Sequence, residues 1–159
     1  MTVTRRLALL GSAALTATVA VVGSAGLASA APAPPPPPAP ASPTPCAVTA
    51  KACVDLSAKK AWLTDGAGHL TRGPVAARGG GSASATPVGT FGVLWKDADH
   101  RSRQFDNAPM PNSVFFYSGV AFHAGDAART SNGCIHLEPA AATAFYENLQ
   151  PSDPVQIVA

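Results

Sequence analysis

Hydrophobic and polar residues alternate over short stretches of the chain after about residue 50, a pattern typical of half-buried β-strands. The predicted strands are residues 53–57, 61–64, 70–77, 90–95, 114–117, 120–123 and 155–158. Turn signals at residues 65–68 (Asp-Gly-Ala-Gly) and 118–119 (Ser-Gly) separate two pairs of these segments. The pattern therefore predicts at least two β-hairpins.

One later segment has the helical period instead. Pro139 suits the first position of a helix, and Pro151 ends the segment. Between them, apolar residues recur at the spacing i, i+3, i+4, i+7: Ala142, Phe145, Tyr146 and Leu149. Several short strands with one late helix predict a mainly β fold, a compact β-sandwich-like domain with one short C-terminal helix.

The connecting segments differ in character. Residues 79–82 (Gly-Gly-Gly-Ser) predict a flexible loop, and residues 96–107 carry enough charge to predict a solvated loop.

The two tryptophans, Trp62 and Trp95, fall in predicted strands. We expect both to pack in the core and not to serve as platforms for sugars.

The N-terminal 30 residues have the three-part pattern of a secretory signal peptide. Arg5 and Arg6 precede an apolar run at residues 7–22, and residues 28–30 (Ala-Ser-Ala) form a small-residue cleavage site. A membrane-spanning helix is the alternative, but the run is short and interrupted by small polar residues. We therefore expect cleavage after residue 30, export by the general or the twin-arginine route, and a secreted protein with no membrane attachment.

Residues 31–45 hold nine of the sixteen prolines. A segment with so few backbone donors and no large apolar side chain is predicted to be an extended polyproline linker. The remaining residues, 46–159, are enough for one modest core and are predicted to form a single domain.

The net charge excludes one class of partner. The formal charge of the whole chain is +2. Both arginines of the predicted signal contribute to it, so the mature chain would carry nine basic and nine acidic residues. A neutral chain of this kind lacks the excess positive charge that binding many phosphates requires, and no nucleic-acid partner is expected.

The three cysteines fall into a pair and a remainder. An exported protein meets an oxidising environment in which disulfides form. Cys46 and Cys53 are close enough in sequence for a disulfide that would hold the N-terminal edge of the domain. Cys134 is then left over, and an odd cysteine in a secreted chain requires an explanation.

Cys134 lies in a small, polar, glycine-containing segment, residues 130–136 (Thr-Ser-Asn-Gly-Cys-Ile-His), and not in an apolar strand. It could be a nucleophile, a buried structural thiol, or a metal ligand together with His123 and His136. A thiol is only about 3% ionised at pH 7, so a nucleophilic role requires a base. His123 comes from the preceding predicted strand, on the face opposite Phe122, and can serve as that base.

Residues 122–125 (Phe-His-Ala-Gly) followed by residues 131–137 (Ser-Asn-Gly-Cys-Ile-His-Leu) resemble the signature of YkuD-type L,D-transpeptidase catalytic domains. Residues 86–91 (Thr-Pro-Val-Gly-Thr-Phe) look like a recurrent segment of that family, and residues 54–63 resemble its opening strand. The resemblance covers about residues 53–159.

Two positions depart from the family pattern. Asn132 stands where the family usually has histidine, and His136 stands where it commonly has arginine or asparagine. Both departures concern substrate contacts and efficiency, because these side chains differ in their donors and in their charge.

The resemblance implies a cysteine-dependent reaction with two central residues. Cys134 would be the nucleophile, and His123 would accept and return the proton. A backbone carbonyl at Ala124 or Gly125 would orient the imidazole, and backbone N–H groups around Gly133 and Cys134 would stabilise the oxyanion. Substrate contacts or loop geometry would fall to Ser131, Asn132 and His136. Neither a metal nor another cofactor is implied.

The implied partners are peptidoglycan stem peptides, one as donor and one as acceptor, and we expect a monomer. Cys134 would attack the diaminopimelate (or equivalent) residue before a terminal D-alanine, release D-Ala, and pass the acyl group to a side-chain amine, which makes a 3→3 crosslink. Two alternatives remain open: an L,D-carboxypeptidase that uses water as acceptor, and a non-catalytic wall-binding protein on the same fold.

Overall fold

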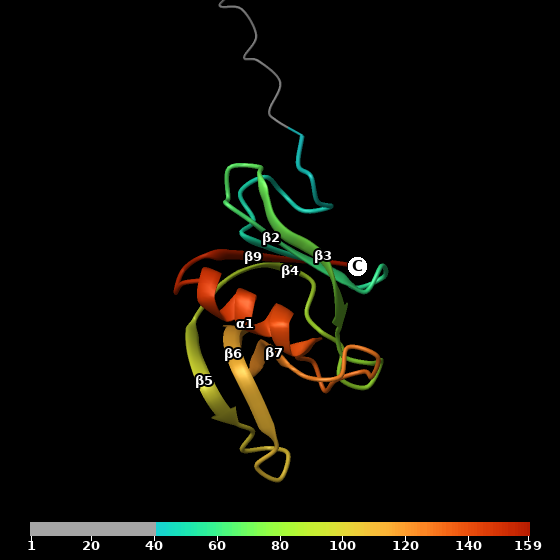
Figure 1. Cartoon of the computed structure of the whole chain (residues 1–159). Helices are drawn as coiled ribbons and strands as arrows, with labels where there is room; N and C mark the ends of the chain where they lie inside the picture. Colours follow the sequence, from blue (N-terminus) through green and yellow to red (C-terminus); the bar gives the residue numbers. More distant parts are fainter. Residues whose placement is uncertain (1–40) are drawn as a thin grey trace, which may run out of the picture. The chain divides into compact units, whose positions relative to one another are not determined.

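The computed structural model describes residues 41–159, which contain nine strands and one helix (Figure 1). The elements are β1 (Ala52–Asp55), β2 (Lys60–Thr64), β3 (Leu70–Arg78), β4 (Gly89–Gly92), β5 (Trp95–Arg101), β6 (Pro109–Tyr117), β7 (Val120–Ala124), β8 (Ile135–Leu137), α1 (Pro139–Asn148) and β9 (Pro154–Val158). The predicted signal peptide, 1–30, and residues 31–40 of the predicted linker lie outside the described residues. Among residues 41–159, no helix is long and apolar enough to cross a membrane.

The strands form one curled sheet in the order β4-β9-β1-β2-β3-β8-β7-β6-β5. β3 joins its two halves, because it pairs with β2 along most of its length and with β8 through Ala77 and Arg78 at its end. Most neighbours are antiparallel, but β1 runs parallel to β9 and β7 runs parallel to β8. The predicted mainly β fold with a single helix is confirmed.

Helix α1 covers one face of the second half of the sheet (Figure 1). Its predicted stripe points into the core: Ala142 and Phe145 are fully buried, and Leu149 is 1% exposed. The Phe145 ring lies 5.1 Å from that of Phe122, which lies 4.9 Å from that of Phe116. This aromatic chain joins the helix to β7 and β6, and the same core includes apolar residues of β1, β2 and β9.

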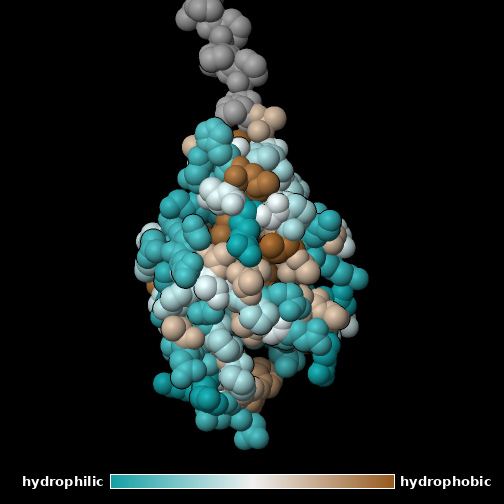
Figure 2. Space-filling model, viewed as in Figure 1, coloured by the Kyte–Doolittle hydropathy of each residue, from teal (hydrophilic) through white to brown (hydrophobic). Residues whose placement is uncertain are grey.

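The surface on the side of α1 is mostly hydrophilic, with small separate apolar patches (Figure 2). This distribution fits a domain whose helix and curled sheet enclose a common core.

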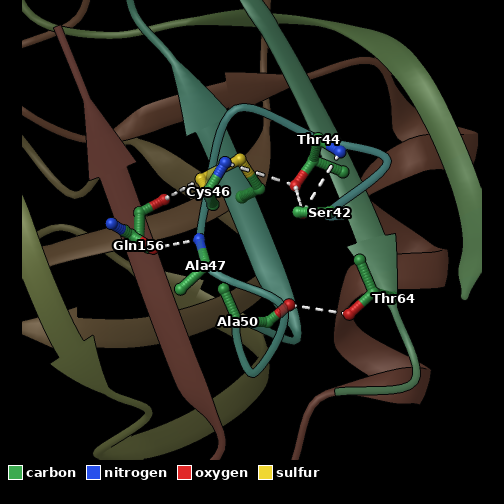
Figure 3. Close-up of a disulfide and its surroundings, with 8 residues drawn as sticks. Ser42, Thr44, Cys46, Ala47, Ala50, Thr64 and Gln156 are labelled. Carbon is green, nitrogen blue, oxygen red and sulfur yellow. Dashed lines mark hydrogen bonds between the residues drawn. A yellow bond between two sulfur atoms is a disulfide. The ribbon is translucent and has the colours of Figure 1, made fainter. Parts of the chain in front are cut away.

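Cys46 and Cys53 form a disulfide with a Cα–Cα distance of 5.7 Å (Figure 3). Since Cys53 lies in β1, the disulfide attaches the segment before β1 to the sheet. A hydrogen bond from the Ala47 N–H to the Gln156 side chain of β9, at 2.7 Å, attaches it a second time. The part of the chain that packs on the domain begins before Cys46. Thr44 is 8% exposed, and its hydroxyl oxygen accepts a hydrogen bond from the Cys46 N–H at 3.3 Å.

Three local predictions were wrong. Residues 96–101 of the predicted loop 96–107 belong to strand β5, because their backbone pairs with β6 while Asp99 and Arg101 stay exposed. Residues 90–95 are not one strand, because β4 ends at Gly92 and β5 begins at Trp95. Trp95 is 44% exposed and does not lie in the core, because β5 is the edge strand of the sheet.

Candidate active site

Parallel pairing of β7 with β8 brings the two signature segments together. The register pairs Phe122 with Ile135 and His123 with His136. Cys134 precedes Ile135 and therefore lies beside Ala121 on the neighbouring strand. Side chains two apart on a strand share a face, so Cys134 lies on the face that also carries His123. Phe122 points the other way, into the core under α1, as the alternation predicted.

The segment before Cys134 is a turn held by Ser131. Ser131 is 8% exposed; its hydroxyl donates to the Cys134 carbonyl and accepts the Gly133 N–H at 3.0 Å. Gly133 has φ +110°, a backbone conformation that side-chain-bearing residues rarely adopt. The turn therefore requires both the serine hydroxyl and the glycine.

A second segment supports this turn from behind. The Thr86 hydroxyl is buried; it donates to the Gly133 carbonyl at 2.8 Å and accepts the Gly80 N–H at 2.9 Å. The Ser131 N–H donates to the Gly79 carbonyl at 3.1 Å. A Cβ at Gly80 would collide with the Ser84 carbonyl and come within 2.9 Å of Gly133 backbone atoms. Residues 79–82 form a loop, as predicted, and its Gly79 and Gly80 pack against the turn that precedes Cys134.

His123 is 6% exposed and has a defined tautomer. Its Nδ1 lies 2.9 Å from the Ala124 carbonyl oxygen, which can only accept a hydrogen bond. Nδ1 therefore carries the hydrogen, and the neutral ring presents an unprotonated Nε2. Burial lowers the pKa of His123 to about 4; its hydrogen bond to Ala124 opposes the shift, and charge repulsion from His136 adds to it.

Cys134 is half-buried and unpaired among the described cysteines. Its Sγ lies 3.8 Å from the Gly119 carbonyl oxygen, a weak contact. Burial raises the pKa of the Cys134 thiol, and a backbone hydrogen bond from Ala121 only partly opposes this shift. At neutral pH the cleft therefore holds a thiol and a neutral imidazole, not a thiolate and an imidazolium.

Both side chains line one cleft of about 410 Å³. One wall comes from residues 119–136 and includes Gly125 and His136. The other comes from the turn between β5 and β6, with Ser102 and Phe105, and from Met110 at the start of β6.

The other predicted site residues fall around this pair. The His136 ring centroid is 4.9 Å from that of His123, with the rings nearly perpendicular, and its Nδ1 lies 3.3 Å from the Asp126 carbonyl. Gly125 packs against the His136 ring: a Cβ there would lie 3.0 Å from it. Asn132 is exposed at the rim of the cleft.

The Gly133 N–H does not fit the predicted role as oxyanion donor, because it already donates to Ser131. Within residues 41–159, the Cys134 N–H donates no hydrogen bond to another backbone group, so it can act as the oxyanion donor.

Sequence reasoning missed the support residues. Thr86 was noticed only as part of a family-like segment, and Gly80 only as part of a glycine run. Their link to Cys134 depends on contacts between segments about fifty residues apart, which no local pattern reveals.

Within residues 41–159, no group of three or more His, Cys, Asp or Glu side chains is placed to hold a metal ion. The zinc alternative through His123, Cys134 and His136 therefore finds no support in the described part of the chain.

Comparison with solved structures identifies the same fold in several L,D-transpeptidases. An L,D-transpeptidase from Stackebrandtia nassauensis is 26% identical, with a TM-score of 0.63, over 68% of this chain and 54% of that one. Another, from Mycobacterium tuberculosis H37Rv, is 21% identical (TM-score 0.63; 68% and 57% covered). L,D-transpeptidase 3 from Mycobacterium tuberculosis, in complex with a faropenem-derived adduct, is 19% identical (TM-score 0.61; 68% and 59% covered).

The chain thus spans between 54% and 59% of the length of these three proteins. No curated protein matches the sequence. The family model of the L,D-transpeptidase catalytic domain matches residues 49–157, which include the whole cleft. The chain therefore belongs to the YkuD family of L,D-transpeptidase catalytic domains.

Proposed function

We propose that the protein is a secreted, cysteine-dependent L,D-transpeptidase that acts on peptidoglycan stem peptides. The observation that carries this proposal is the arrangement of Cys134 and His123, which share one face of neighbouring strands and line one cleft. Secretion is supported by the signal pattern of residues 1–30 and by the Cys46–Cys53 disulfide, which is typical of proteins in oxidising compartments.

The first half-reaction is acylation of Cys134. The Cys134 Sγ attacks the carbonyl carbon between the third residue of the stem and its terminal D-alanine, and the thiol proton moves to His123 Nε2. The C–N bond then breaks, and His123 returns the proton to the leaving amine of D-Ala. An acyl-thioester on Cys134 remains.

The second half-reaction regenerates the thiol. A side-chain amine of another stem attacks the thioester carbon and loses a proton to His123 Nε2. The C–S bond breaks, the sulfur takes the proton back, and the new amide is a 3→3 crosslink. Proton uptake and return balance in each half, so the cycle consumes no cofactor.

The protonation states suit this sequence of events. Because burial disfavours charge on both groups, the resting site holds a thiol and a neutral base. The proton then moves as the C–S bond forms, and charge develops only in the transition state. The Ala124 carbonyl stabilises the imidazolium that forms, because it accepts the Nδ1 hydrogen.

The developing oxyanion requires donors of its own. The Cys134 N–H is the candidate donor, since the Gly133 N–H already donates a hydrogen bond to Ser131. One well-aimed donor of this kind is typically worth about 3 kcal/mol of transition-state stabilisation. Ser131 and Thr86 would contribute indirectly, because they fix the turn that aims the Cys134 backbone.

Incubation of the purified full-length chain with disaccharide-tetrapeptide tests the proposal. We expect released D-Ala and a crosslinked dimer, both detected by mass spectrometry. Released D-Ala without dimer would favour the carboxypeptidase. Neither product, together with binding to isolated sacculi that survives Cys134→Ala, would favour the wall-binding protein and overturn the proposal.

A further inference from the structure

The face of the sheet that carries Cys134 continues, beyond the cleft, to an exposed tryptophan. The strand register pairs Trp95 of β5 with Phe115 of β6, and Phe115 with Ala121 of β7. Ala121 in turn lies beside Cys134. Trp95, Phe115 and Ala121 therefore form one row across β5, β6 and β7, and Cys134, the residue just before β8, continues it.

These residues share a face and contact one another. The Trp95 and Phe115 rings are stacked, with centroids 3.8 Å apart and planes 12° from parallel. Phe115, Ala121 and Met110 form one buried cluster, against which Cys134 packs. Met110 also lines the cleft, so the row is continuous with the proposed active site.

We propose that Trp95 is a subsite for the amino sugar that carries the donor stem peptide. The inference rests on the proposed function, since it takes the donor to be a stem peptide attached to a disaccharide. One face of the indole is covered by Phe115, and the side chain is 44% exposed, which leaves apolar ring surface open to a ligand. A hexopyranose ring presents a flat array of C–H groups that buries well against such a surface.

The spacing fits the donor. Neighbouring strands lie about 4.8 Å apart, so three spacings place Trp95 about 14 Å from Cys134. Three extended residues, from the attacked carbonyl back to the start of a tetrapeptide stem, span about 10 Å. The group that links peptide to sugar adds a few ångströms, which brings the sugar ring over Trp95.

Polar groups beside the indole suit a sugar as well. The His100 ring lies edge-on to Trp95 at 5.4 Å and to Phe115 at 5.0 Å. Its Nδ1 lies 3.1 Å from the Asp97 carboxylate, which accepts that hydrogen and leaves Nε2 free for a hydroxyl or acetamide group. An aromatic platform with fixed polar groups at its edge distinguishes a sugar from a purely apolar ligand.

The test compares two donors that differ only in the sugar: disaccharide-tetrapeptide and the bare tetrapeptide. We expect the wild-type chain to have the higher kcat/KM with the disaccharide donor. Trp95→Ala should lower that value about tenfold while changing the value for the bare tetrapeptide less than about twofold, a selective loss of about 1.4 kcal/mol. Trp95→Tyr, which keeps an aromatic platform, should recover most of the difference.

Tyr117→Ala is the matched control, because Tyr117 is another exposed aromatic of this sheet (47% exposed) and its ring contacts Phe91 instead of this row. It should leave the ratio of the two kcat/KM values unchanged. Equal losses with both donors after Trp95→Ala, or no preference in the wild type, would overturn the subsite.

A binding measurement separates this inference from the proposed function. In Cys134→Ala, the disaccharide-tetrapeptide should shift the indole N–H resonance of Trp95, whereas that of Trp62, the other tryptophan of the chain, should stay in place. The bare tetrapeptide should leave the Trp95 signal almost unchanged. A selective Trp95 shift without D-Ala release by the wild type would support the subsite and reject the transpeptidase; turnover without the shift would do the reverse.

Discussion

The packed loop behind Cys134 leads to a prediction about two adjacent glycines. An alanine at position 80 would place its Cβ against the Ser84 carbonyl and 2.8 Å from the Gly133 nitrogen, all backbone atoms that cannot rotate away. An alanine at position 81 would meet only the Thr130 side chain, at 3.8 Å or more. Gly80→Ala and Gly81→Ala thus add the same atom to neighbouring positions with opposite expected outcomes.

The magnitude follows from the overlap. Overpacking of a filled site typically costs 1–3 kcal/mol. We therefore expect Gly80→Ala to lower the free energy of unfolding by about 2 kcal/mol and the Tm by about 6–12 °C. Gly81→Ala should stay within about 0.5 kcal/mol of wild type. Because the overlap displaces Gly133, the Cys134 that follows it should also be misplaced.

Thermal unfolding and carbapenem acylation of Cys134, followed by intact mass, measure the two effects. Acylation of Gly80→Ala at a temperature well below its Tm should be slowed about 10- to 100-fold, because a displacement of about 1 Å at a reacting atom has consequences of this size. If Gly80→Ala unfolds and acylates like Gly81→Ala, the loop does not support the nucleophile.

Three further predictions concern the support, the base and the disulfide. Thr86→Val should lower the free energy of unfolding by about 1–3 kcal/mol, because it leaves the buried Gly133 carbonyl without its donor; chemical denaturation measures this, with Thr86→Ser as the control that retains the hydroxyl. Because the pKa of His123 is lowered to about 4, the unfolded chain binds more protons than the folded one between about pH 4 and pH 6.5. Stability should therefore fall as pH drops through this window, and His123→Gln should remove that part of the slope. Replacement of both Cys46 and Cys53 by serine should cost about 2.5 kcal/mol, the loop entropy of a short disulfide ring, in thermal unfolding.

Each of these three predictions has a clear contrary result. Equal stability of the valine and serine variants at position 86 would mean that the hydroxyl is not the donor. A pH slope that survives in His123→Gln would assign the titration to another group. A double serine variant as stable as the wild type would mean that the disulfide does not constrain the unfolded chain.

The sequence predicted most of the elements correctly where one face is buried and the other is solvated. The helix stripe from Ala142 to Leu149 is an example, because its apolar spacing is set by the core it contacts. Strand β5 was missed because its charged residues carry no alternation that a local reading can recognise, and only pairing with β6 makes it a strand. Trp95 was misplaced for the same reason: exposure depends on the strand order, which puts β5 at the edge.

The candidate site was predicted in part. Cys134 and His123 were singled out because an odd cysteine needs a base and because the two segments resemble a family signature. That they share a face depends on the parallel pairing of β7 with β8, and the tautomer of His123 depends on where the Ala124 carbonyl points. The use of the Gly133 N–H by Ser131 is likewise a matter of turn geometry, which residue types alone do not specify.

Cys134 is the proposed nucleophile of the cleft, and intact-mass spectrometry after mild exposure to a carbapenem tests this role most directly. The wild-type chain should gain the mass of one drug molecule, located by peptide mapping on Cys134, and Cys134→Ala should gain none. A wild-type chain that stays unmodified, or an adduct that persists in Cys134→Ala, would contradict this role of Cys134.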